Sequence, residues 1–198
     1  MSMEYRKVFR YFPLCCVILF GAMFWTFPET AAAPQDGVGR AAAQADPWAS
    51  APGKVVVLIF VRTDCPIANR YAPEITRLSA AHSSDASFWM VYPDKRETSE
   101  AIRKHELEYH LALPVLRDPQ RELLKRAQVS VTPEAAVFDA KGRLVYHGRI
   151  DNWFEDFGRA RPAPTTHELA DAIAVAVSGR PATLPSVAAV GCYLSDLQ

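Results

Sequence analysis

Four cysteines are the residues of this chain best suited to covalent chemistry. Cys15 and Cys16 fall inside an N-terminal apolar run, so the rest of the chain keeps two thiols, Cys65 and Cys192. The thiolate form of cysteine is a nucleophile, and the first steps of its oxidation are reversible. In an oxidising compartment, two thiols form either a disulfide or a working redox pair. The cysteine pattern therefore predicts thiol redox chemistry or a structural cross-link.

Cys65 lies where a buried strand is expected to turn into a helix. Residues 54–61 form a run rich in β-branched side chains, typical of a central strand covered on both faces. Pro66 is well placed at the first position of a helix. The unpaired N–H groups at a helix start favour a thiolate, whereas Asp64 disfavours it and Arg62 offsets Asp64. The alternative is a buried cysteine that packs as a small hydrophobe.

Cys192 lies in a C-terminal tail that begins at Arg180. As a redox partner, it would attack a sulfenic acid or a mixed disulfide formed at Cys65. As a structural partner, it would fix the tail by a permanent disulfide. As a lone thiol, it would pair with another molecule. The sequence leaves these roles open, because the first two differ in reduction potential and not in connectivity.

The elements around Cys65 alternate between strands and helices. The first helix extends from Pro66 to about His82, and a turn at Lys141–Gly142 implies an antiparallel hairpin. A capping box at residues 165–168 starts the last helix, which ends at Ser178. Further strands are expected at 87–92, 114–117, 134–139 and 143–150, and further helices at 99–109 and 120–127, with Asp118 as N-cap. This order predicts an α/β fold with a central mixed sheet flanked by helices, in which a helix–strand–helix insert precedes the C-terminal hairpin and helix.

The N-terminus has the pattern of an export signal. Basic residues precede the apolar run Leu14–Phe27, which is shorter than the roughly 20 residues that a membrane span needs. Small residues follow this run, and residues 1–33 are therefore expected to form a cleaved signal peptide. An uncleaved membrane anchor at residues 8–27 is the alternative. Both readings place the protein outside the cytoplasm, in the periplasm or the extracellular space.

Composition sets the remaining bounds. Residues 34–50 are expected to form a flexible linker, and residues 51–198 a single domain with its tail. Twenty-two basic and 22 acidic residues give a formal net charge of +0, and no basic cluster stands out. Nucleic-acid binding is therefore not expected, because a phosphate backbone calls for a concentrated positive patch.

These elements and motifs resemble the thioredoxin superfamily. The order of elements, the cysteine at the first strand-to-helix turn and the Thr132–Pro133 pair before the hairpin carry the resemblance. The insert is similar to the redoxin branch, which includes the alkyl hydroperoxide reductase/thiol-specific antioxidant and peroxiredoxin-like proteins. The resemblance covers about residues 50–194. The stretches most similar to a bacterial peroxiredoxin-like subgroup are residues 63–74, 132–139, 148–151, 161–168 and 190–192.

The resemblance implies a thioredoxin-like fold with Cys65 as its reactive thiol. It also implies that Pro133 is a cis-proline beside this thiol, which presents the backbone of Thr132 for pairing with a substrate chain. The alternative is an ordinary proline at the start of a strand.

The chain departs from both standard motifs of these relatives. Ala68 stands where the thioredoxin Cys-x-x-Cys has its second cysteine. Arg62 and Leu58 stand where the peroxiredoxin signature has threonine and proline. Neither standard dithiol exchange nor standard peroxide reduction therefore carries over unchanged, and the only partner for Cys65 within the domain is Cys192.

Two polar residues complete the predicted site. Asn69 is four residues after Cys65 and so shares its helix face, from which it would donate to the thiolate or to a bound oxyanion. The alternative is an ordinary polar residue of the surface. Arg149, after the hairpin, is expected either to supply a cation near the site or to form an exposed ion pair. Of the five histidines, His82, His105 and His110 are expected on helix surfaces. His147 is the one expected to approach Cys65.

The leading prediction is an extracytoplasmic thiol-dependent oxidoreductase in which Cys65 reduces a disulfide or a peroxide and Cys192 resolves the product. Its expected partners are a protein disulfide or a small peroxide, an external thiol reductant and an exported electron-transfer protein. No cofactor is expected. Membrane contact is expected only through the N-terminal segment. One alternative is a non-catalytic binding or assembly module locked by a Cys65–Cys192 disulfide. The other is a copper carrier that uses Cys65, His147 and Cys192.

Overall fold

The structure is a computed structural model that describes residues 45–180 and 182–194. The chain divides into two compact units, Met1–Pro34 and Gln35–Gln198, and every described residue belongs to the second. The predicted signal peptide or anchor lies outside the described residues, as do residues 34–44 of the predicted linker. No helix in the described part is both long enough and apolar enough to cross a membrane.

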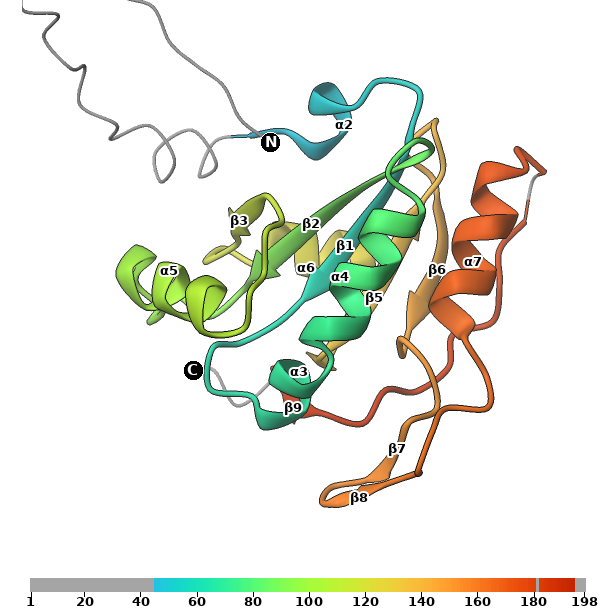
Figure 1. Ribbon diagram of the computed structural model, residues 1–198. Coiled ribbons are helices and arrows are strands. Elements are labelled where there is room, and N and C mark those ends of the chain that lie inside the picture. Colours follow the sequence, from blue (N-terminus) through green and yellow to red (C-terminus); the bar gives the residue numbers. More distant parts are fainter. Residues whose placement is uncertain (1–44, 181, 195–198) are drawn as a thin grey trace, which may run out of the picture. The chain divides into compact units, whose positions relative to one another are not determined.

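A five-stranded mixed sheet forms the centre of this unit (Figure 1). Its strand order is β3-β2-β1-β5-β6. The central strand β1 pairs in parallel with β2 and antiparallel with β5, which confirms the predicted mixed sheet. The strands of the sheet are β1 (Val55–Phe60), β2 (Ala86–Tyr92), β3 (Val115–Arg117), β5 (Glu134–Phe138) and β6 (Leu144–Gly148).

Strand β1 is buried along its whole length. Side chains alternate between the two faces of a strand, so Val57 and Ile59 join one core cluster whereas Leu58 and Phe60 join the other. Burial on both faces explains why this strand reads as one apolar run instead of an alternating one.

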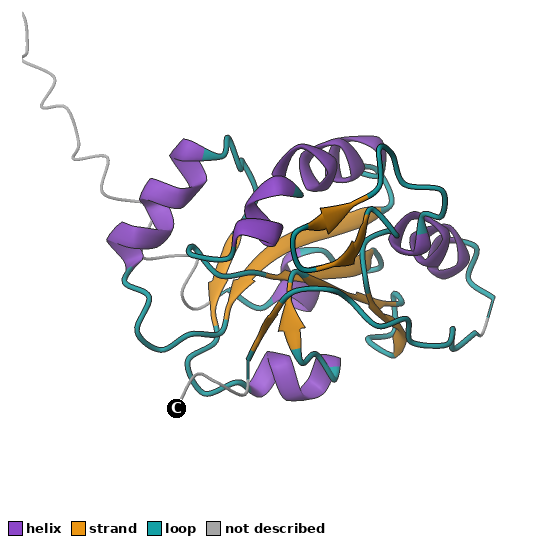
Figure 2. Ribbon diagram, turned by 90° about the horizontal axis from the view of Figure 1, so that it is seen from below, coloured by secondary structure: helices purple, strands orange, loops and turns teal. Residues whose placement is uncertain are grey.

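Helices cover both faces of the sheet (Figure 2). The core cluster that contains Val57 takes buried side chains from α3, α4, α5 and α7. The cluster that contains Phe60 takes a buried side chain from α6, and the partly buried Trp48 of α2 packs against it. The helices are α2 (Pro47–Ser50), α3 (Pro66–Arg70), α4 (Ala72–Ala81), α5 (Ser99–Glu108), α6 (Glu122–Ala127) and α7 (Glu168–Val177).

The single helix predicted after Cys65 is broken into α3 and α4 at Tyr71. Pro73 lies in the first turn of α4 and has no N–H group to donate to the preceding turn. The chain therefore caps α3 and starts a new helix within one residue. This break keeps α3 short, and it separates the turn that carries Cys65 from the longer packing helix.

Two predicted helix starts also differ. Helix α6 begins at Glu122 and not at residue 120, although the Asp118 carboxylate still accepts hydrogen bonds from the N–H groups of Glu122 and Leu124. The N-cap of α7 is His167, and no side chain caps this helix. The predicted capping box is wrong because the Thr166 hydroxyl donates to the Glu168 carboxylate instead.

Short elements appear where none was predicted. Residues 47–50 of the predicted linker form α2, whose Trp48 packs edge-on against Phe138 at 5.3 Å between ring centroids. The loop predicted after the hairpin contains a second small hairpin, formed by β7 (Phe154–Asp156) and β8 (Arg159–Ala160). Most important for the site, β4 (Val131–Thr132) pairs with β9 (Cys192–Tyr193).

Candidate active site

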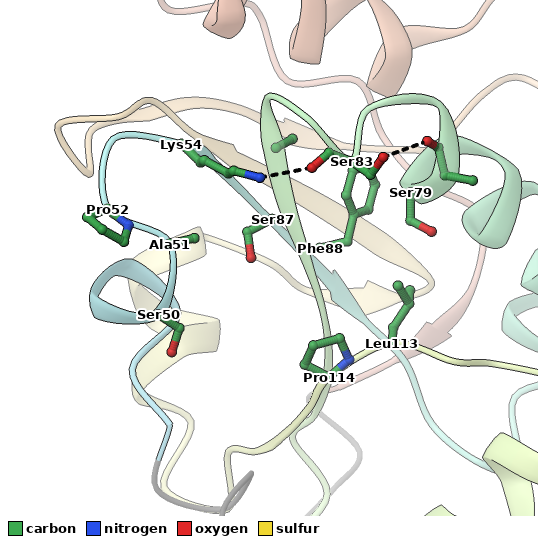
Figure 3. A pocket seen from close by; sticks show the side chains of 12 residues that line it. Ser50, Ala51, Pro52, Lys54, Ser79, Ser83, Ser87, Phe88, Leu113 and Pro114 are labelled. Atoms are coloured by element: carbon green, nitrogen blue, oxygen red, sulfur yellow. Dashed lines mark hydrogen bonds between the residues drawn. The ribbon is translucent and has the colours of Figure 1, made fainter.

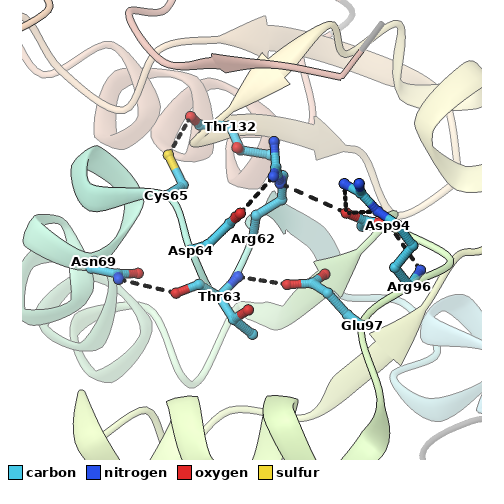
Figure 4. Close-up of polar contacts among 9 residues, drawn as sticks. All are labelled: Arg62, Thr63, Asp64, Cys65, Asn69, Asp94, Arg96, Glu97 and Thr132. Atoms are coloured by element: carbon cyan, nitrogen blue, oxygen red, sulfur yellow. Dashed lines mark hydrogen bonds and ion pairs between the residues drawn. The ribbon is translucent and has the colours of Figure 1, made fainter. Parts of the chain in front are cut away.

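Cys65 lies at the predicted junction, between the end of β1 and the first residue of α3. Its side chain is 0% exposed. The thiol donates a hydrogen bond to the carbonyl oxygen of Thr132, with 3.0 Å between sulfur and oxygen (Figure 4). The strand-to-helix turn therefore points the sulfur at the loop before β5, and not into solvent.

The Thr132–Pro133 peptide bond is cis, as the resemblance implies. This bond lies between β4 and β5, and Thr132, whose carbonyl oxygen faces Cys65, is the last residue of β4. Glu134, directly after the proline, is buried, and its carboxylate accepts hydrogen bonds from the N–H groups of Ser130 and Val131 at 2.9 and 3.3 Å. These bonds hold the loop in the shape that presents Thr132 to the thiol. Sequence reasoning did not single out Glu134.

Cys192 arrives at the same place from the C-terminal tail. In the antiparallel pairing of β4 with β9, Cys192 stands opposite Thr132, and Tyr193 stands opposite Val131. Both cysteines of the described part are free thiols. Cys65, Thr132 and Cys192 therefore come together from three segments that are far apart in the sequence.

The environment of Cys192 favours the protonated thiol over the thiolate. Burial, and next to it the adjoining Cys65 side chain, together raise the pKa of the Cys192 thiol to about 12, whereas Arg62 acts in the opposite direction. Cys192 is therefore protonated at neutral pH while Cys65 is reduced.

Charges before Cys65 are paired as expected. A guanidinium nitrogen of Arg62 lies 2.7 Å from a carboxylate oxygen of Asp64, and the side chains are 14% and 67% exposed, respectively. The same guanidinium lies 4.0 Å from the buried carboxylate of Asp94. Arg62 therefore lies between the exposed Asp64 and the buried Asp94 (Figure 4).

Asn69 does not donate to the thiol in this arrangement. Its amide nitrogen donates to the carbonyl oxygen of Thr63 at 3.2 Å, and its amide oxygen lies 2.8 Å from a ring nitrogen of His105. The other ring nitrogen of His105 lies 2.8 Å from the hydroxyl of Tyr92. Asn69 therefore acts on Cys65 only through the loop that it holds.

The prediction for His105 is wrong, because this residue is buried and not on a helix surface. Its ring packs between Tyr92 and Tyr109, and burial lowers its pKa, so the imidazole is neutral at neutral pH. A neutral ring can bridge a hydroxyl and an amide with one donor and one acceptor.

Glu97 binds the backbone of the turn that carries Cys65. One carboxylate oxygen accepts a hydrogen bond from the N–H group of Thr63 at 2.6 Å (Figure 4). The other oxygen is buried and has no hydrogen-bond partner within the described residues. Burial is the main cause that raises the pKa of this carboxyl group. No local sequence pattern marks Glu97, because its partner lies 34 residues earlier in the chain.

Replacing Glu97 by glutamine tests this arrangement through the pH dependence of stability. A raised pKa in the folded state means that the native carboxyl contributes most below its unfolded pKa of about 4.3 and loses that contribution as the pH rises through its folded pKa. Glutamine keeps an oxygen acceptor for Thr63 and does not ionise. We therefore expect Glu97→Gln to be more stable than the native protein at pH 8 and to lose this advantage at pH 4, as measured by urea unfolding.

The exposed Glu108 on α5 supplies the control, since Glu108→Gln removes a carboxylate that water solvates. Its effect on stability should stay within about 0.5 kcal/mol at both pH values. A difference between Glu97→Gln and the native protein that is the same at pH 4 and pH 8 would contradict the prediction.

Arg149 and His147 have other partners. Arg149 forms an ion pair with Glu168 at the start of α7, as the ion-pair alternative predicts, but the pair is partly buried and not exposed. His147 lies 3.2 Å from a carboxylate oxygen of Glu134 and 3.4 Å from the hydroxyl of Ser186. Neither contact involves Cys65 or Cys192.

The copper site predicted from Cys65, His147 and Cys192 does not assemble. In the part of the chain that the structure describes, the donor atoms that cluster at metal-binding distance belong to Glu74, Asp151 and His167. Two of these already have partners, since Asp151 accepts from Tyr71 at 2.6 Å and Glu74 pairs with Arg77. Among the described residues, no set of donor atoms therefore supports the metal-carrier alternative.

A cavity of about 570 Å³ lies away from this site (Figure 3). It is lined by residues around the start of β1 and β2, including Lys54, Ser83 and Phe88. The Lys54 ammonium donates to the carbonyl oxygen of Ser83 across it. Cys65 follows the opposite end of β1, so this cavity is not part of the thiol site.

The chain has three features of the thioredoxin superfamily: a mixed sheet, a cysteine directly before α3, and a cis-proline loop that faces this cysteine. It is a member of this superfamily. Residues 40–157 match the model of the family described as Redoxin. This match covers more than half of the chain, and the protein belongs to the Redoxin family. A comparison with curated proteins found no match.

Solved structures share the fold. An uncharacterized conserved protein from Geobacillus kaustophilus is 23% identical, with a TM-score of 0.61 over 72% of this chain and 77% of that chain. A hypothetical protein from Sinorhizobium meliloti 1021 is 19% identical, with a TM-score of 0.57 over 72% of this chain and 79% of that chain. Likeness at this level of identity describes the architecture and not the activity.

Proposed function

We propose that the protein is a thiol-dependent oxidoreductase in which Cys65 is the reacting thiol and Cys192 is its partner within the chain. One observation carries the proposal: the backbone pairing that sets Cys192 opposite Thr132, whose carbonyl accepts the Cys65 thiol. A pairing of this kind brings the two sulfurs to one point without a Cys-x-x-Cys motif. The family and the cis-proline support the same reading.

Both expected substrates lead to the same product. With a peroxide, the Cys65 thiolate attacks one oxygen, the O–O bond breaks, an alcohol or water leaves, and Cys65 becomes a sulfenic acid. Cys192 then attacks this sulfur, and water leaves as the disulfide forms. With a disulfide substrate, Cys65 attacks one sulfur and releases the other as a thiolate, and Cys192 then displaces the remaining substrate thiol. In each case two electrons pass to the substrate.

Turnover requires a reductant for the Cys65–Cys192 disulfide. A dithiol, or two monothiols, supplies the two electrons and leaves as its own disulfide. We propose an external thiol reductant for this step, and an exported electron-transfer protein as a partner. The Glu97 and Asn69 contacts hold the turn that positions the attacking sulfur.

The reduction potential of the Cys65–Cys192 pair tests the proposal. The full-length protein is equilibrated in dithiothreitol buffers, the free thiols are alkylated, and the disulfide fraction is measured by peptide mass mapping. A catalytic pair should have a potential between about −120 and −270 mV. A potential below about −300 mV would identify a permanent lock and a non-catalytic module. Absence of the disulfide after peroxide treatment would also contradict the proposal.

We propose that this chemistry takes place outside the cytoplasm. Support comes from the basic residues and the apolar run Leu14–Phe27 that precede the domain. N-terminal sequencing of the protein recovered from the periplasm or medium checks both forms of the proposal. A new N-terminus near residue 34 indicates cleavage, and an intact N-terminus in the membrane fraction indicates an anchor. Recovery in the cytosol alone would contradict both.

A further inference from the structure

The tail that carries Cys192 is attached along its length, in addition to β9. The N–H group of Leu184 donates to the carbonyl oxygen of Val145 in β6 at 2.8 Å. Val187 forms a bridge with Gly148, and its carbonyl oxygen accepts from the N–H group of Arg149 at 3.0 Å. The tail therefore crosses the end of β6 before it reaches β4 (Figure 1).

Contact between the tail and the site is close enough to require glycine. A Cβ atom on Gly191 would lie 2.1 Å from the carbonyl oxygen of Thr132, the same oxygen that accepts the Cys65 thiol. No side chain fits there, because the atoms that it would meet belong to the backbone of Thr132 and Pro133. At the far end of β9, Leu194 is buried in the core cluster that contains Phe60. The N–H group of Leu194 donates to the carbonyl oxygen of Ser130 at 2.9 Å. Residues 191–194 thus fit closely along β4 as an added strand.

This strand position is where an extended chain can add to β4. A strand edge binds an extended segment through its main-chain N–H and C=O groups, which are not specific for one sequence. Here β9 occupies the strand edge formed by Val131 and Thr132, and Cys65 is fully buried. A polypeptide that pairs with the same edge must take the place of β9.

We propose that residues 191–194 are an internal occupant of the strand position at which an extended, cysteine-bearing polypeptide adds to β4, so that the tail and a polypeptide substrate exclude each other. This inference rests on the proposed function and names its substrate class. It also fixes the register, because Cys192 shows which position of the incoming strand meets Cys65. The small residue before this cysteine is needed for the same reason that Gly191 is.

The order of steps follows from this exclusion. The tail leaves, the substrate strand pairs with β4, and the Cys65 thiolate attacks the substrate sulfur that stands opposite Thr132. The substrate disulfide breaks, and its second sulfur leaves as a thiolate. The substrate strand then unpairs from β4 while its cysteine stays bound to Cys65, and the tail returns. Cys192 attacks the Cys65 sulfur and forms the intramolecular disulfide, and the substrate cysteine leaves as a thiolate. The tail therefore acts first as a competitor and then as the resolving group.

A point substitution separates the tail from β4 without removing Cys192. Gly191→Ala places a methyl group 2.1 Å from a backbone oxygen, so the pairing at Thr132 cannot form. Ala188→Ser is the matched control, because Ala188 is an exposed residue of the same tail. A chain that ends at Ala189 removes β9 altogether and serves as a second variant. Circular dichroism checks that each variant is folded.

The probe is an extended cysteine peptide activated as a mixed disulfide with thionitrobenzoate. A second version carries N-methyl groups beside its cysteine, so that it cannot pair with a strand edge. The initial rate of reaction is followed by the release of thionitrobenzoate, and peptide mass mapping of each variant assigns the reaction to Cys65. We expect Gly191→Ala and the shortened chain to react at least ten times faster with the unmodified peptide, and Ala188→Ser to react at the native rate. The N-methylated peptide should gain much less.

Three outcomes would count against the inference. Unchanged peptide rates in both tail variants would overturn it, as would equal gains for the two peptides, which would mean that the tail only shields the thiol. In either case the proposed function stands if Cys65 still reacts with the small reagent dithiobis(nitrobenzoate). A Cys65 that fails to react with this reagent in every variant would overturn the proposed function and the inference with it.

Discussion

Serine in place of Cys65 is expected to lower disulfide and peroxide reduction by about 10³-fold or more. A hydroxyl does not ionise at neutral pH and cannot form the disulfide with Cys192. The substitution should leave the fold intact, because serine is close in size and its O–H group can still donate to the carbonyl oxygen of Thr132. Steady-state reduction of insulin and of hydrogen peroxide, with dithiothreitol as the reductant, measures the loss.

Cys192→Ser is the matched control for this prediction. It removes the resolving thiol but keeps β9 and the reacting sulfur, so the first chemical step should proceed and stop at a sulfenic acid or a mixed disulfide. Turnover should then depend on a thiol that can reduce this product directly. Equal activity of Cys65→Ser and the native protein would exclude the proposed role of Cys65.

Phe60→Ala is expected to destabilise the protein by about 3–5 kcal/mol, because it opens a cavity in a close-packed core. Phe60 is fully buried and is the last residue of β1, paired with Val91 on one side and with Glu134 on the other. It therefore supports both the turn that carries Cys65 and the residue after the cis-proline. Urea unfolding should show a lower midpoint with an unchanged m-value.

Phe157 provides the comparison for this measurement, since its side chain is 55% exposed at the β7–β8 hairpin. Phe157→Ala should change the free energy of unfolding by no more than about 0.5 kcal/mol. A cost below about 1 kcal/mol for Phe60→Ala would show that the core around β1 closes around the missing ring.

Local features of the sequence were sufficient to predict the scaffold of the site. The apolar run of β1, the proline after Cys65 and the Thr132–Pro133 pair each act within a few residues of the chain. They determine a strand, a helix start and a proline loop without reference to distant segments. For this reason the mixed sheet and the position of Cys65 were predicted correctly.

Contacts between distant segments were not predictable in the same way. Strand β9 has two residues, too few for an alternating pattern, and four strands and one helix separate it in sequence from its partner β4. The contact of Asn69 with His105 was not predictable from local sequence, because the two residues are 36 positions apart. The break at Tyr71 was missed although Pro73 marks it, since proline is common in the first turn of a helix.

The attachments of the tail at Leu184 and Val187 have a consequence for affinity. Opening of β9 alone breaks neither of these contacts, so the released strand would remain within a few residues of β4. A short flexible tether of this kind gives the strand an effective concentration in the millimolar range. A free peptide must reach a similar concentration to displace it. Efficient substrates are therefore expected to be proteins that dock a second surface near the site and so bring a tethered strand of their own.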